Sequence, residues 1–448
     1  MRRPVTADER LFGTDGIRGR VGTDPITPSF AYHLGRTLAA HALTPNALVY
    51  VGRDTRASSL ELETYLAHGF VDGGAQVASL GVLPTPGISY CTKESPADFG
   101  IVITASHNPH EYNGFKLFGS DGAKLDDPVE HQIEQWLLNS DRKKPARDLE
   151  ALDPDHRASD SYLKMLTASA TQIGHNGLRI VVDCAHGATT TTAAQIFGHL
   201  CNDLHFIGNA PNGVNINKDV GSTSLSAVQR SVMELKADLG IAFDGDGDRV
   251  LFVDDHGDLV GGDQVLYLLA KRHLTSDASE DGVVGTIMSN HGLQIALDKI
   301  GIPFIRADVG DKNVYDELKS RQWRLGGEPS GHLIWRDIAE TGDGILIGLC
   351  VIDVIHRERS SLRQLVASVS MLPQAERNVH SPKPHDSLQK TEVKELITQF
   401  RTLVASEGRL LVRASGTEPL IRVMVEHQVA TTANEFADTL ASSISAAI

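Results

Sequence analysis

The 448-residue sequence predicts an α/β protein with three similar α/β units containing mixed sheets, followed by a smaller C-terminal α+β domain. Apolar strand-like runs alternate with helix-like segments along most of the chain, which is typical of βαβ units. The runs are apolar throughout, as expected for strands that are buried on both faces. Polar gaps at residues 139–160, near 253–262 and near 371–386 separate the units. They predict four domains, at residues 1–150, 151–255, 256–370 and 371–448.

The composition narrows the class of protein. A hydrophobic content of 41% and a charged content of 22% are ordinary for a globular protein. The formal net charge of −15 argues against nucleic acid or an anionic membrane as a partner, although a local arginine cluster can still bind a small anion. The most apolar run, residues 344–356, is shorter than the roughly 20 residues of a membrane span. The four cysteines lack CxxC spacing and the first ten residues lack the apolar core of a secretory signal, so we expect a cytoplasmic protein.

The first unit combines strand-like runs with arginine-bearing loops. "FGTDGIRG" (12–19) places Arg18 in a glycine-rich loop, and "VGRDTR" (51–56) supplies Arg53 and Arg56 at the end of a strand. A helical pattern covers residues 58–72. The predicted strands are residues 47–52, 75–81 and 99–105.

The last of these strands runs into "TASHNP", where Ser106 is followed by His107. An ordinary turn is one interpretation, because Ser, Asn and Pro are common turn residues. The other interpretation is a nucleophile or phosphate carrier, because open α/β sheets place their ligands at the carboxyl ends of strands. The charged stretch 139–160 then predicts a linker.

The second unit contains an acidic loop. Predicted strands at 178–184 and 239–244 precede "FDGDGDRV", in which Asp244, Asp246 and Asp248 alternate with glycines. Small residues between the aspartates let three carboxylates converge, and such hard oxygen ligands suit Mg²⁺ or Ca²⁺. An EF-hand is excluded, because Arg249 and Asp255 stand where its loop requires glycine and glutamate.

The third unit has a loop suited to a sugar. After a predicted strand at 283–289, "GGEPSGHLIW" (326–335) presents Glu328, Ser330 and His332 between small residues. A carboxylate, a hydroxyl and an imidazole together suit sugar hydroxyls, whereas a plain Gly/Pro turn is the alternative.

The last domain ends in "RASGTEPLIRVMVE" (413–426), a turn between two strand-like runs. Arginine forks, hydroxyls and backbone amides at such a turn predict a phosphate cradle. Its candidate residues are Arg413, Ser415, Gly416, Thr417 and Arg422. The preceding stretch 371–386 predicts a linker to this domain.

These motifs, in this order, resemble the α-D-phosphohexomutase superfamily, and within it the branch of bacterial phosphoglucosamine mutases. The resemblance extends from residue 11 to residue 426 and includes "PNGVNIN" (211–217). It implies four domains around a central cleft, a phosphorylated Ser106, and one Mg²⁺ held by Ser106 with the three aspartates. It also implies that Lys116 and Arg18 flank the transfer site, that residues 328–332 recognise the sugar and that the C-terminal cradle holds the phosphate that does not react.

The implied reaction interconverts glucosamine 6-phosphate and glucosamine 1-phosphate through a sugar 1,6-bisphosphate, towards UDP-N-acetylglucosamine and cell-wall synthesis. His107, Lys116 and Arg249 would add positive charge near the phosphoryl group. Either Lys116 or His332 could take the hydroxyl proton. The family also suggests a homodimer. The alternatives are a phosphomannomutase or phosphoglucomutase with the same residues, a metal-dependent phosphatase, and a sugar-phosphate sensor without turnover.

Several positions depart from the branch pattern. Pro329 interrupts the sugar loop where Gln, Asn or Met is usual, and therefore bears on the substrate. His186 stands where Asn is usual, and Lys312 where Arg is common. We expect the change at His186, like that in "VGSTS" (220–224), to be tolerated. Lys312 keeps the positive charge but lacks the planar fork of arginine.

Overall fold

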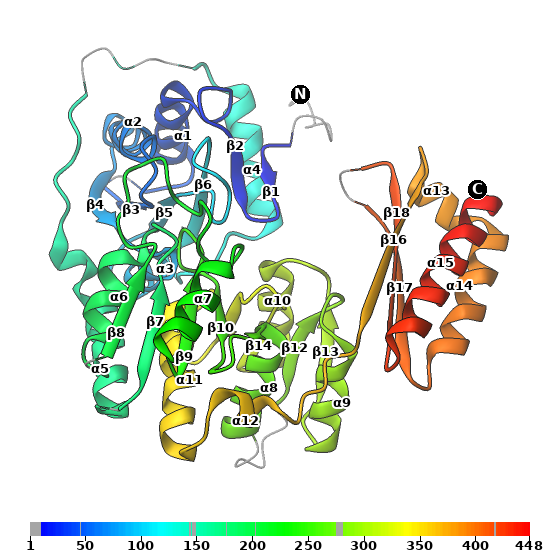
Figure 1. Cartoon of the computed structure of the whole chain (residues 1–448). Coiled ribbons are helices and arrows are strands. Elements are labelled where there is room, and N and C mark those ends of the chain that lie inside the picture. The colour runs from blue at the N-terminus through cyan, green and yellow to red at the C-terminus, as the bar shows by residue number, and fades with distance from the viewer. Residues whose placement is uncertain are drawn as a thin grey trace. The chain divides into compact units, whose positions relative to one another are not determined.

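A computed structural model describes residues 10–44, 46–142, 145, 149–175, 177–201, 203–274, 281–415 and 418–448. The described residues fall into two compact units. One lies within residues 1–286 and 305–366, and the other lies within residues 287–304 and 367–448. Figure 1 shows the order of the elements along the chain.

The first sheet has six strands in the order β1-β2-β6-β5-β3-β4. Strand β3 pairs in parallel with β4 and β5, while the other neighbours are antiparallel, so the sheet is mixed. Its strands are β1 (Phe12–Gly13), β2 (Gly16–Arg20), β3 (Leu48–Arg53), β4 (Gln76–Val82), β5 (Phe99–Ile103) and β6 (Tyr112–Gly119). Its helices are α1 (Pro28–His41), α2 (Ser59–Asp72), α3 (Thr85–Lys93) and α4 (Asp127–Asn139). Every residue of β5 is buried, as the apolar run predicts.

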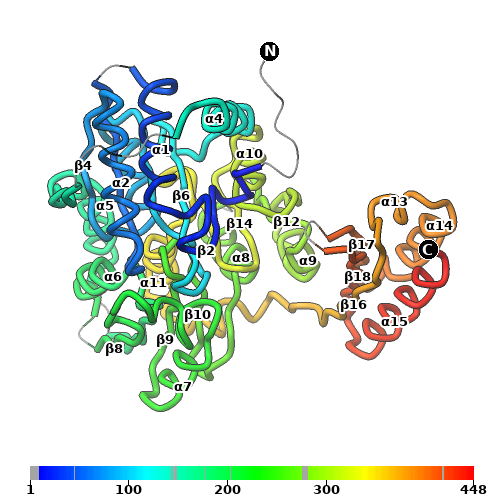
Figure 2. The backbone as a smooth tube through the Cα atoms, turned by 90° about the horizontal axis from the view of Figure 1, so that it is seen from above, coloured from blue at the N-terminus to red at the C-terminus, as the bar shows by residue number. Residues whose placement is uncertain are grey.

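Helices α1 and α2 lie side by side, as Figures 1 and 2 show. Each contributes a glycine where the two backbones approach. A Cβ at Gly35 would lie 2.2 Å from the Leu66 carbonyl oxygen, and a Cβ at Gly69 would lie 2.2 Å from that of Tyr32. Only glycine fits this reciprocal contact.

The second sheet has five strands in the order β11-β10-β9-β7-β8, of which β7, β8 and β9 are parallel. Its strands are β7 (Arg179–Asp183), β8 (Asp203–Ile207), β9 (Leu239–Phe243), β10 (Val250–Val253) and β11 (Leu259–Val260). Its helices are α5 (His156–Ile173), α6 (Thr189–Phe197) and α7 (Ser226–Leu235). The predicted linker 139–160 is wrong at its end, because Asp155 caps α5 by accepting the Arg157 amide at 3.1 Å.

The third sheet has four strands in the order β13-β12-β14-β15. Its strands are β12 (Val283–Thr286), β13 (Phe304–Ala307), β14 (Leu325–Gly327) and β15 (Leu333–Trp335). The accompanying helices are α8 (Gly262–His273), α10 (Asp311–Arg321), α11 (Gly344–Glu358) and α12 (Leu362–Val366). Strand β12 ends at Thr286, earlier than predicted, and a turn at residues 287–289 leads to Asn290, which caps α9 (His291–Lys299). The most apolar run of the sequence forms α11, and no helix of the described chain could span a membrane.

The fourth sheet has three antiparallel strands in the order β16-β18-β17. It comprises β16 (Gln374–His380), β17 (Gly408–Ala414) and β18 (Leu420–His427), with helices α13 (Pro384–Gln389), α14 (Thr391–Val404) and α15 (Ala430–Ala447). Helix α9 (His291–Lys299) belongs to the same unit. The predicted linker 371–386 is therefore wrong in its middle, because β16 pairs with β18 over its whole length.

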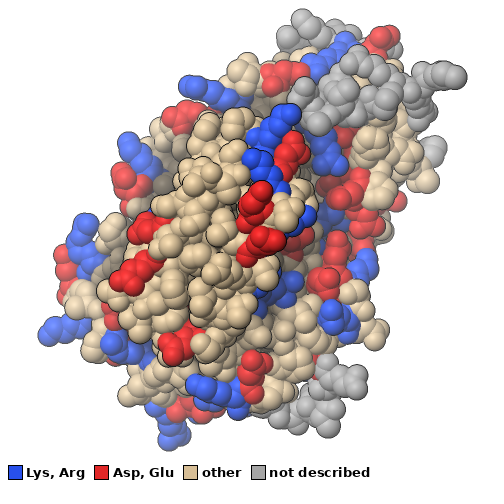
Figure 3. All heavy atoms as spheres, turned by 90° about the vertical axis from the view of Figure 1, so that its right-hand side faces the viewer, with Lys and Arg blue, Asp and Glu red and all other residues tan. Residues whose placement is uncertain are grey.

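Three mixed sheets with helices and a smaller α+β domain confirm the predicted fold class. The cleft between all four domains stays a prediction, as do the boundaries at residues 150, 255 and 370. On the face shown in Figure 3, acidic and basic side chains are interspersed.

Candidate active site

Ser106 lies just beyond the carboxyl end of β5, in the loop that leads to β6. The residue is fully buried, and its backbone is left-handed with a φ of 51°. Its hydroxyl donates to Asp244 Oδ2 at 2.6 Å and lies 3.3 Å from His107 Nδ1. Its amide donates to Thr104 Oγ1 at 2.9 Å, which fixes the start of the loop. The structure thus brings Ser106 against an aspartate of the acidic loop.

The acidic loop connects the antiparallel strands β9 and β10. Asp244 Oδ1 accepts the amides of Gly247 and Arg249 at 3.1 and 3.2 Å, which holds the loop in its curled form. One oxygen from each of Asp244, Asp246 and Asp248 lies within 4.8 Å of the others, and all three residues are buried. The three predicted ligands therefore converge on one point.

The donor set fits a small divalent cation. Burial raises the pKa of Asp244 well above its ordinary value, and the charges of Asp246 and Asp248 raise it further. The Oδ1 atoms of Asp246 and Asp248 are buried and make no hydrogen bond within the described part of the chain. Buried carboxylate oxygens without partners are costly unless a cation compensates them, and hard oxygen ligands suit Mg²⁺.

The ammonium group of Lys116, on β6, lies against this cluster of aspartates. Its Nζ lies 2.6 Å from Asp248 Oδ2, 2.8 Å from Asp246 Oδ2 and 3.2 Å from Asp15 Oδ2. Burial alone would lower the pKa of Lys116, but these three carboxylates raise it well above its ordinary value. Lys116 therefore neutralises part of a buried acidic cluster that is built from two sheets.

Asp15 extends this network and was not predicted. It forms ion pairs with Arg18 and Lys124, and Lys124 also pairs with Asp311 at the start of α10. Burial would raise the pKa of Asp15, but Lys116, Lys124 and Arg18 lower it well below its ordinary value. The signal was present in "FGTDGIRG", where an aspartate stands three residues before the arginine.

The two remaining basic side chains near Ser106, His107 and Arg249, differ in protonation state. Burial lowers the pKa of His107 to about 4, with further lowering by Arg249 and Arg18, so this imidazole is neutral near pH 7. Arg249 keeps its charge, because Asp248 and Asp244 outweigh the effect of its burial and raise its pKa. Its Nε lies 3.8 Å from Asp248 Oδ1.

His332 is buried beside the acidic loop, between β14 and β15. Its Nδ1 lies 3.7 Å from Asp248 Oδ1, and its Nε2 accepts the Gly342 amide at 3.0 Å. Burial would lower the pKa of His332, but Asp311 and Asp248 raise it.

The other candidate residues of the sugar loop, Glu328 and Ser330, are partly or fully exposed. Glu328 Oε1 accepts the Gly310 amide at 3.1 Å, and Ser330 is exposed. Gly331 has a φ of 90°, which lets the chain reverse between Glu328 and His332. Pro329 lies in this turn, and its carbonyl oxygen accepts the Gly262 amide at 3.2 Å.

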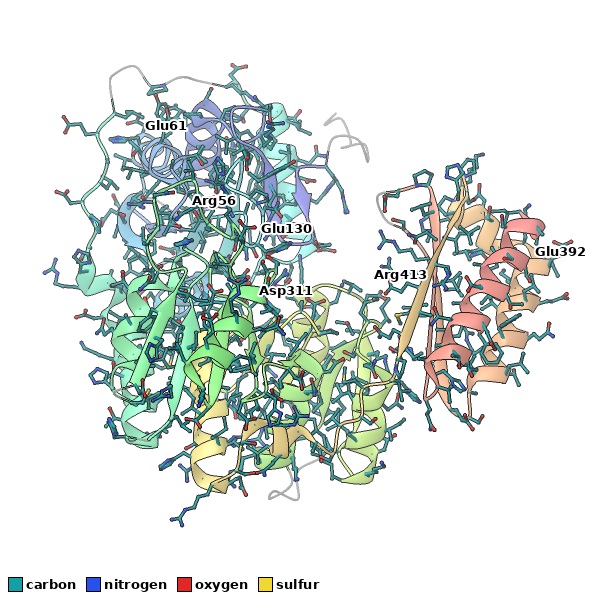
Figure 4. The ribbon with its side chains drawn as sticks, viewed as in Figure 1. Arg56, Glu61, Glu130, Asp311, Glu392 and Arg413 are labelled. Atoms are coloured by element: carbon teal, nitrogen blue, oxygen red, sulfur yellow. The ribbon has the colours of Figure 1, made fainter. Side chains whose placement is uncertain are left out.

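The C-terminal candidates lie in the second unit. Arg413 on β17 and Arg422 on β18 occupy directly opposite positions in the antiparallel strand pair. Figure 4 shows Arg413 on the face of this sheet opposite α14 and α15. Like charges directly opposite each other destabilise a strand pair, so an anion between them would be stabilising. Ser415 donates its amide to the Leu420 carbonyl at 2.8 Å, whereas Gly416 and Thr417 lie outside the described residues.

The two arginines of "VGRDTR" make hydrogen bonds within the fold. Arg53 Nε binds Glu63 at 2.7 Å, and Arg56 is buried among backbone carbonyl oxygens near Ser106. Lys312, the replacement for arginine, binds Asp127 and Glu130 of α4 at 2.6 and 3.3 Å. These side chains therefore stabilise the fold around the site.

Comparison with known proteins agrees with this geometry. The phosphoglucomutase/phosphomannomutase families match in order: α/β/α domain I at residues 9–144, domain II at 160–257, domain III at 261–371 and the C-terminal domain at 376–443. A phosphoglucosamine mutase from Proteus mirabilis is 43% identical over 97% of this chain and 99% of its own length. One from Idiomarina loihiensis is 44% identical over 98% and 99%.

Solved structures share the fold. A phosphoglucomutase/phosphomannomutase family protein from Burkholderia thailandensis superposes with a TM-score of 0.79 at 23% identity, covering 98% of both chains. The N-acetylphosphoglucosamine mutase of Aspergillus fumigatus, solved with GlcNAc-6P and magnesium, has a TM-score of 0.67 at 18% identity, covering 98% of this chain and 96% of its own. This chain belongs to the phosphoglucomutase/phosphomannomutase family, the α-D-phosphohexomutases, and within it to the branch of the phosphoglucosamine mutases.

Proposed function

We propose that this chain interconverts glucosamine 6-phosphate and glucosamine 1-phosphate by way of a phosphorylated Ser106. The observation that carries the proposal is the contact of the buried Ser106 hydroxyl with Asp244 Oδ2 at 2.6 Å, inside a cluster of three aspartates. A plain turn has no need of a buried serine aimed at converging carboxylates. The family membership and the curated relatives support the same reaction class, an isomerase that moves a phosphoryl group within one sugar.

In this proposal Ser106 carries the phosphoryl group, and Asp244, Asp246 and Asp248 hold Mg²⁺ with it. The bound cation would supply Lewis-acid stabilisation of the phosphoryl oxygens. The free hydroxyl of the sugar monophosphate attacks the phosphorus atom and the bond from phosphorus to Ser106 Oγ breaks, which yields the sugar 1,6-bisphosphate. After the bisphosphate turns over, its other phosphoryl group returns to Ser106. The proton of the attacking hydroxyl passes to His332 rather than Lys116, because the neighbouring carboxylates raise the pKa of Lys116 and keep its ammonium group protonated.

The other predicted residues take supporting roles. Lys116, Arg18 and Arg249 supply positive charge around the transferred group, and neutral His107 lies beside the serine hydroxyl. Glu328, Ser330 and His332 recognise the sugar. Arg413, Ser415, Gly416, Thr417 and Arg422 hold the phosphate that does not react.

We also propose the predicted division into domains at 1–150, 151–255, 256–370 and 371–448, arranged around a central cleft. The matched ranges 9–144, 160–257, 261–371 and 376–443 support this division. A cytoplasmic homodimer that feeds UDP-N-acetylglucosamine synthesis completes the proposal.

A substrate panel tests the reaction first. Phosphorylated enzyme with Mg²⁺ and a trace of sugar bisphosphate is given glucosamine, mannose and glucose phosphates, and kcat/KM is compared. A strong preference for the amino sugar is expected. Comparable rates on mannose or glucose phosphate would move the chain to a phosphomannomutase or phosphoglucomutase activity, with Pro329 as the first residue to exchange.

The phosphoserine step is tested separately with Ser106→Ala. We expect turnover to be abolished while the fold and much of the substrate binding persist. Full activity in this variant would overturn the mechanism. Release of free phosphate without isomerised sugar from the wild type would instead indicate a phosphatase.

A further inference from the structure

Arg56 is buried beneath the loop that carries Ser106. It follows β3 and is only 2% exposed, although it is a large cation. Its Nε donates to Asp54 Oδ2 at 2.7 Å. Its two remaining nitrogens donate to four backbone carbonyl oxygens of one loop, those of Ser106, Asn108, Pro109 and Tyr112. A buried guanidinium is thus satisfied almost entirely by the phosphoserine loop.

Asn217 binds two of the same carbonyl oxygens. It closes the segment 211–217, which lies between β8 and α7 of the second sheet. Its Nδ2 donates to the Ser106 oxygen at 2.9 Å and to the Asn108 oxygen at 3.1 Å. Arg56 Nη2 reaches these two oxygens at 2.9 and 2.8 Å. Each oxygen therefore accepts one donor from the first sheet's domain and one from the second's.

Gly245, in the acidic loop, makes room for this contact. A Cβ at this position would lie 2.6 Å from the Ser106 carbonyl oxygen and 2.8 Å from Asn217 Nδ2. The phosphoserine loop, the metal loop and Asn217 consequently meet at one point.

Arg56 and Asn217, which we call the clamp, hold the backbone of Ser106 in an unfavourable conformation. A non-glycine residue in the left-handed region is strained and persists only where its surroundings enforce this conformation. At Ser106 this conformation turns the carbonyl oxygen to the two donors and the hydroxyl to Asp244. If the donors are removed, the loop is free to relax to φ < 0, which would carry the hydroxyl away from the aspartates.

We propose that Arg56 and Asn217 act together as positioning residues for phosphoryl transfer at Ser106. The proposal rests on the proposed function of Ser106 and adds that two side chains from different domains set the direction of its hydroxyl. Because neither touches the sugar, their loss should lower kcat and leave KM for the sugar phosphate nearly unchanged.

Arg56→Lys and Asn217→Ala test this in the full-length enzyme. Each should lower kcat by about 10- to 100-fold, since misplacement of a reacting group by about 1 Å has such an effect. KM should change by less than about threefold. A second readout is the rate at which glucose 1,6-bisphosphate phosphorylates Ser106, followed by intact mass, which should fall in parallel with kcat.

The double variant distinguishes a shared role from two separate ones. Effects of residues that share partners are not additive. Because both donors bind the same two oxygens, the double variant should be within about threefold of the slower single variant. Multiplicative losses would overturn the shared clamp.

Matched controls come from the same two segments. Arg53→Lys exchanges an arginine that pairs with Glu63, and Asn215→Ala exchanges an asparagine whose amide binds Ala210 within its own loop. Both should keep kcat within about threefold of the wild type, since neither contacts the phosphoserine loop.

The outcomes distinguish a failure of the proposed function from a failure of the clamp alone. A wild type that neither isomerises the sugar nor gains phosphate on Ser106 would overturn the proposed function and the clamp with it. A fully active wild type whose Arg56→Lys and Asn217→Ala forms behave like the controls would overturn the clamp alone. If Arg56→Lys fails to fold, the comparison of Asn217→Ala with Asn215→Ala decides the question.

Discussion

At the scale of single residues, the site depends on how buried charges are compensated. Lys116 contacts Asp15, Asp246 and Asp248, which come from two different sheets. Removing one member of a buried ion cluster typically costs 3–5 kcal/mol, because the partners stay buried and uncompensated. Exposed pairs contribute roughly 0–1 kcal/mol.

Lys116→Met should therefore lower the unfolding temperature strongly, and added Mg²⁺ should restore part of the loss by compensating the aspartates. Thermal unfolding with EDTA and with MgCl₂ measures both effects. Lys93→Met is the control, because Lys93 binds Glu340 from a side chain that is 33% exposed. Equal unfolding temperatures for Lys116→Met and the wild type would contradict the role of Lys116 in compensating these charges.

The spacing of the three aspartates was sufficient to predict that they converge, whereas only the family resemblance placed Ser106 beside them. The sequence drew attention to Arg56 but did not predict its burial. The carbonyl oxygens that surround its guanidinium belong to a segment about 50 residues away, from Asn108 to Tyr112. The fit of His186 in place of the usual asparagine is visible only in the fold. Its φ is 50°, a region that Asn and His tolerate, and its Nδ1 accepts the Ala210 amide at 3.2 Å.

At the scale of elements, the crossing of α1 and α2 gives a clear prediction. Exchanging Gly69 for alanine gains about 1 kcal/mol of helix propensity. The new Cβ would however lie 2.2 Å from the Tyr32 carbonyl oxygen, and backbone has little freedom to move away. Overpacking costs about 1–3 kcal/mol or more, so we expect a net loss of stability.

Chemical denaturation of Gly69→Ala measures this loss, and Gly177→Ala is its control. A Cβ at Gly177 would meet no atom within 4 Å. Unchanged stability of Gly69→Ala would mean that the two helices separate at little cost.

The amino end of α11 gives a second prediction, on pH. Burial raises the pKa of Asp343 to about 6, while its carboxylate caps α11 through the Leu346 amide at 3.0 Å and accepts from Tyr162. A raised carboxyl pKa means that the folded state binds the proton more tightly. Its contribution to stability is therefore present at about pH 4 and is lost as pH rises through 6, by about 3 kcal/mol.

Asp343→Asn keeps a good helix cap and removes this titration. Relative to the wild type, the variant should gain stability between pH 4 and pH 7. Thermal unfolding across that range measures the difference. A constant difference at all pH values would show that the carboxyl group does not titrate there.

Strands β5 and β9, whose apolar patterns are uniform, were predicted to within one or two residues, whereas β12 ends three residues earlier than predicted. Elements that begin in polar sequence were missed. Helix α5 starts inside a charged stretch and β16 lies between prolines, because a cap at Asp155 and pairing with β18 outweigh local composition.

At the scale of the whole molecule, the buried acidic cluster with Ser106 and the two opposed arginines belong to different compact units. The first unit contains Ser106, Lys116 and the aspartates, while the second contains Arg413 and Arg422. In the proposed function these two sites grip different phosphates of the same sugar. Damage to each should therefore have a different kinetic signature.

Arg413→Met should raise KM for the sugar monophosphate by about 10- to 100-fold, since a charge-assisted bidentate contact contributes about 1.5–3 kcal/mol. Stability should be unchanged or higher, because the opposed Arg422 loses a like charge. Arg401→Met, an exposed residue of α14 on the other side of the sheet, is the control and should leave KM unchanged. Steady-state kinetics with thermal unfolding measures both effects. An unchanged KM in Arg413→Met would remove the second unit from phosphate recognition, even with Ser106 fully active.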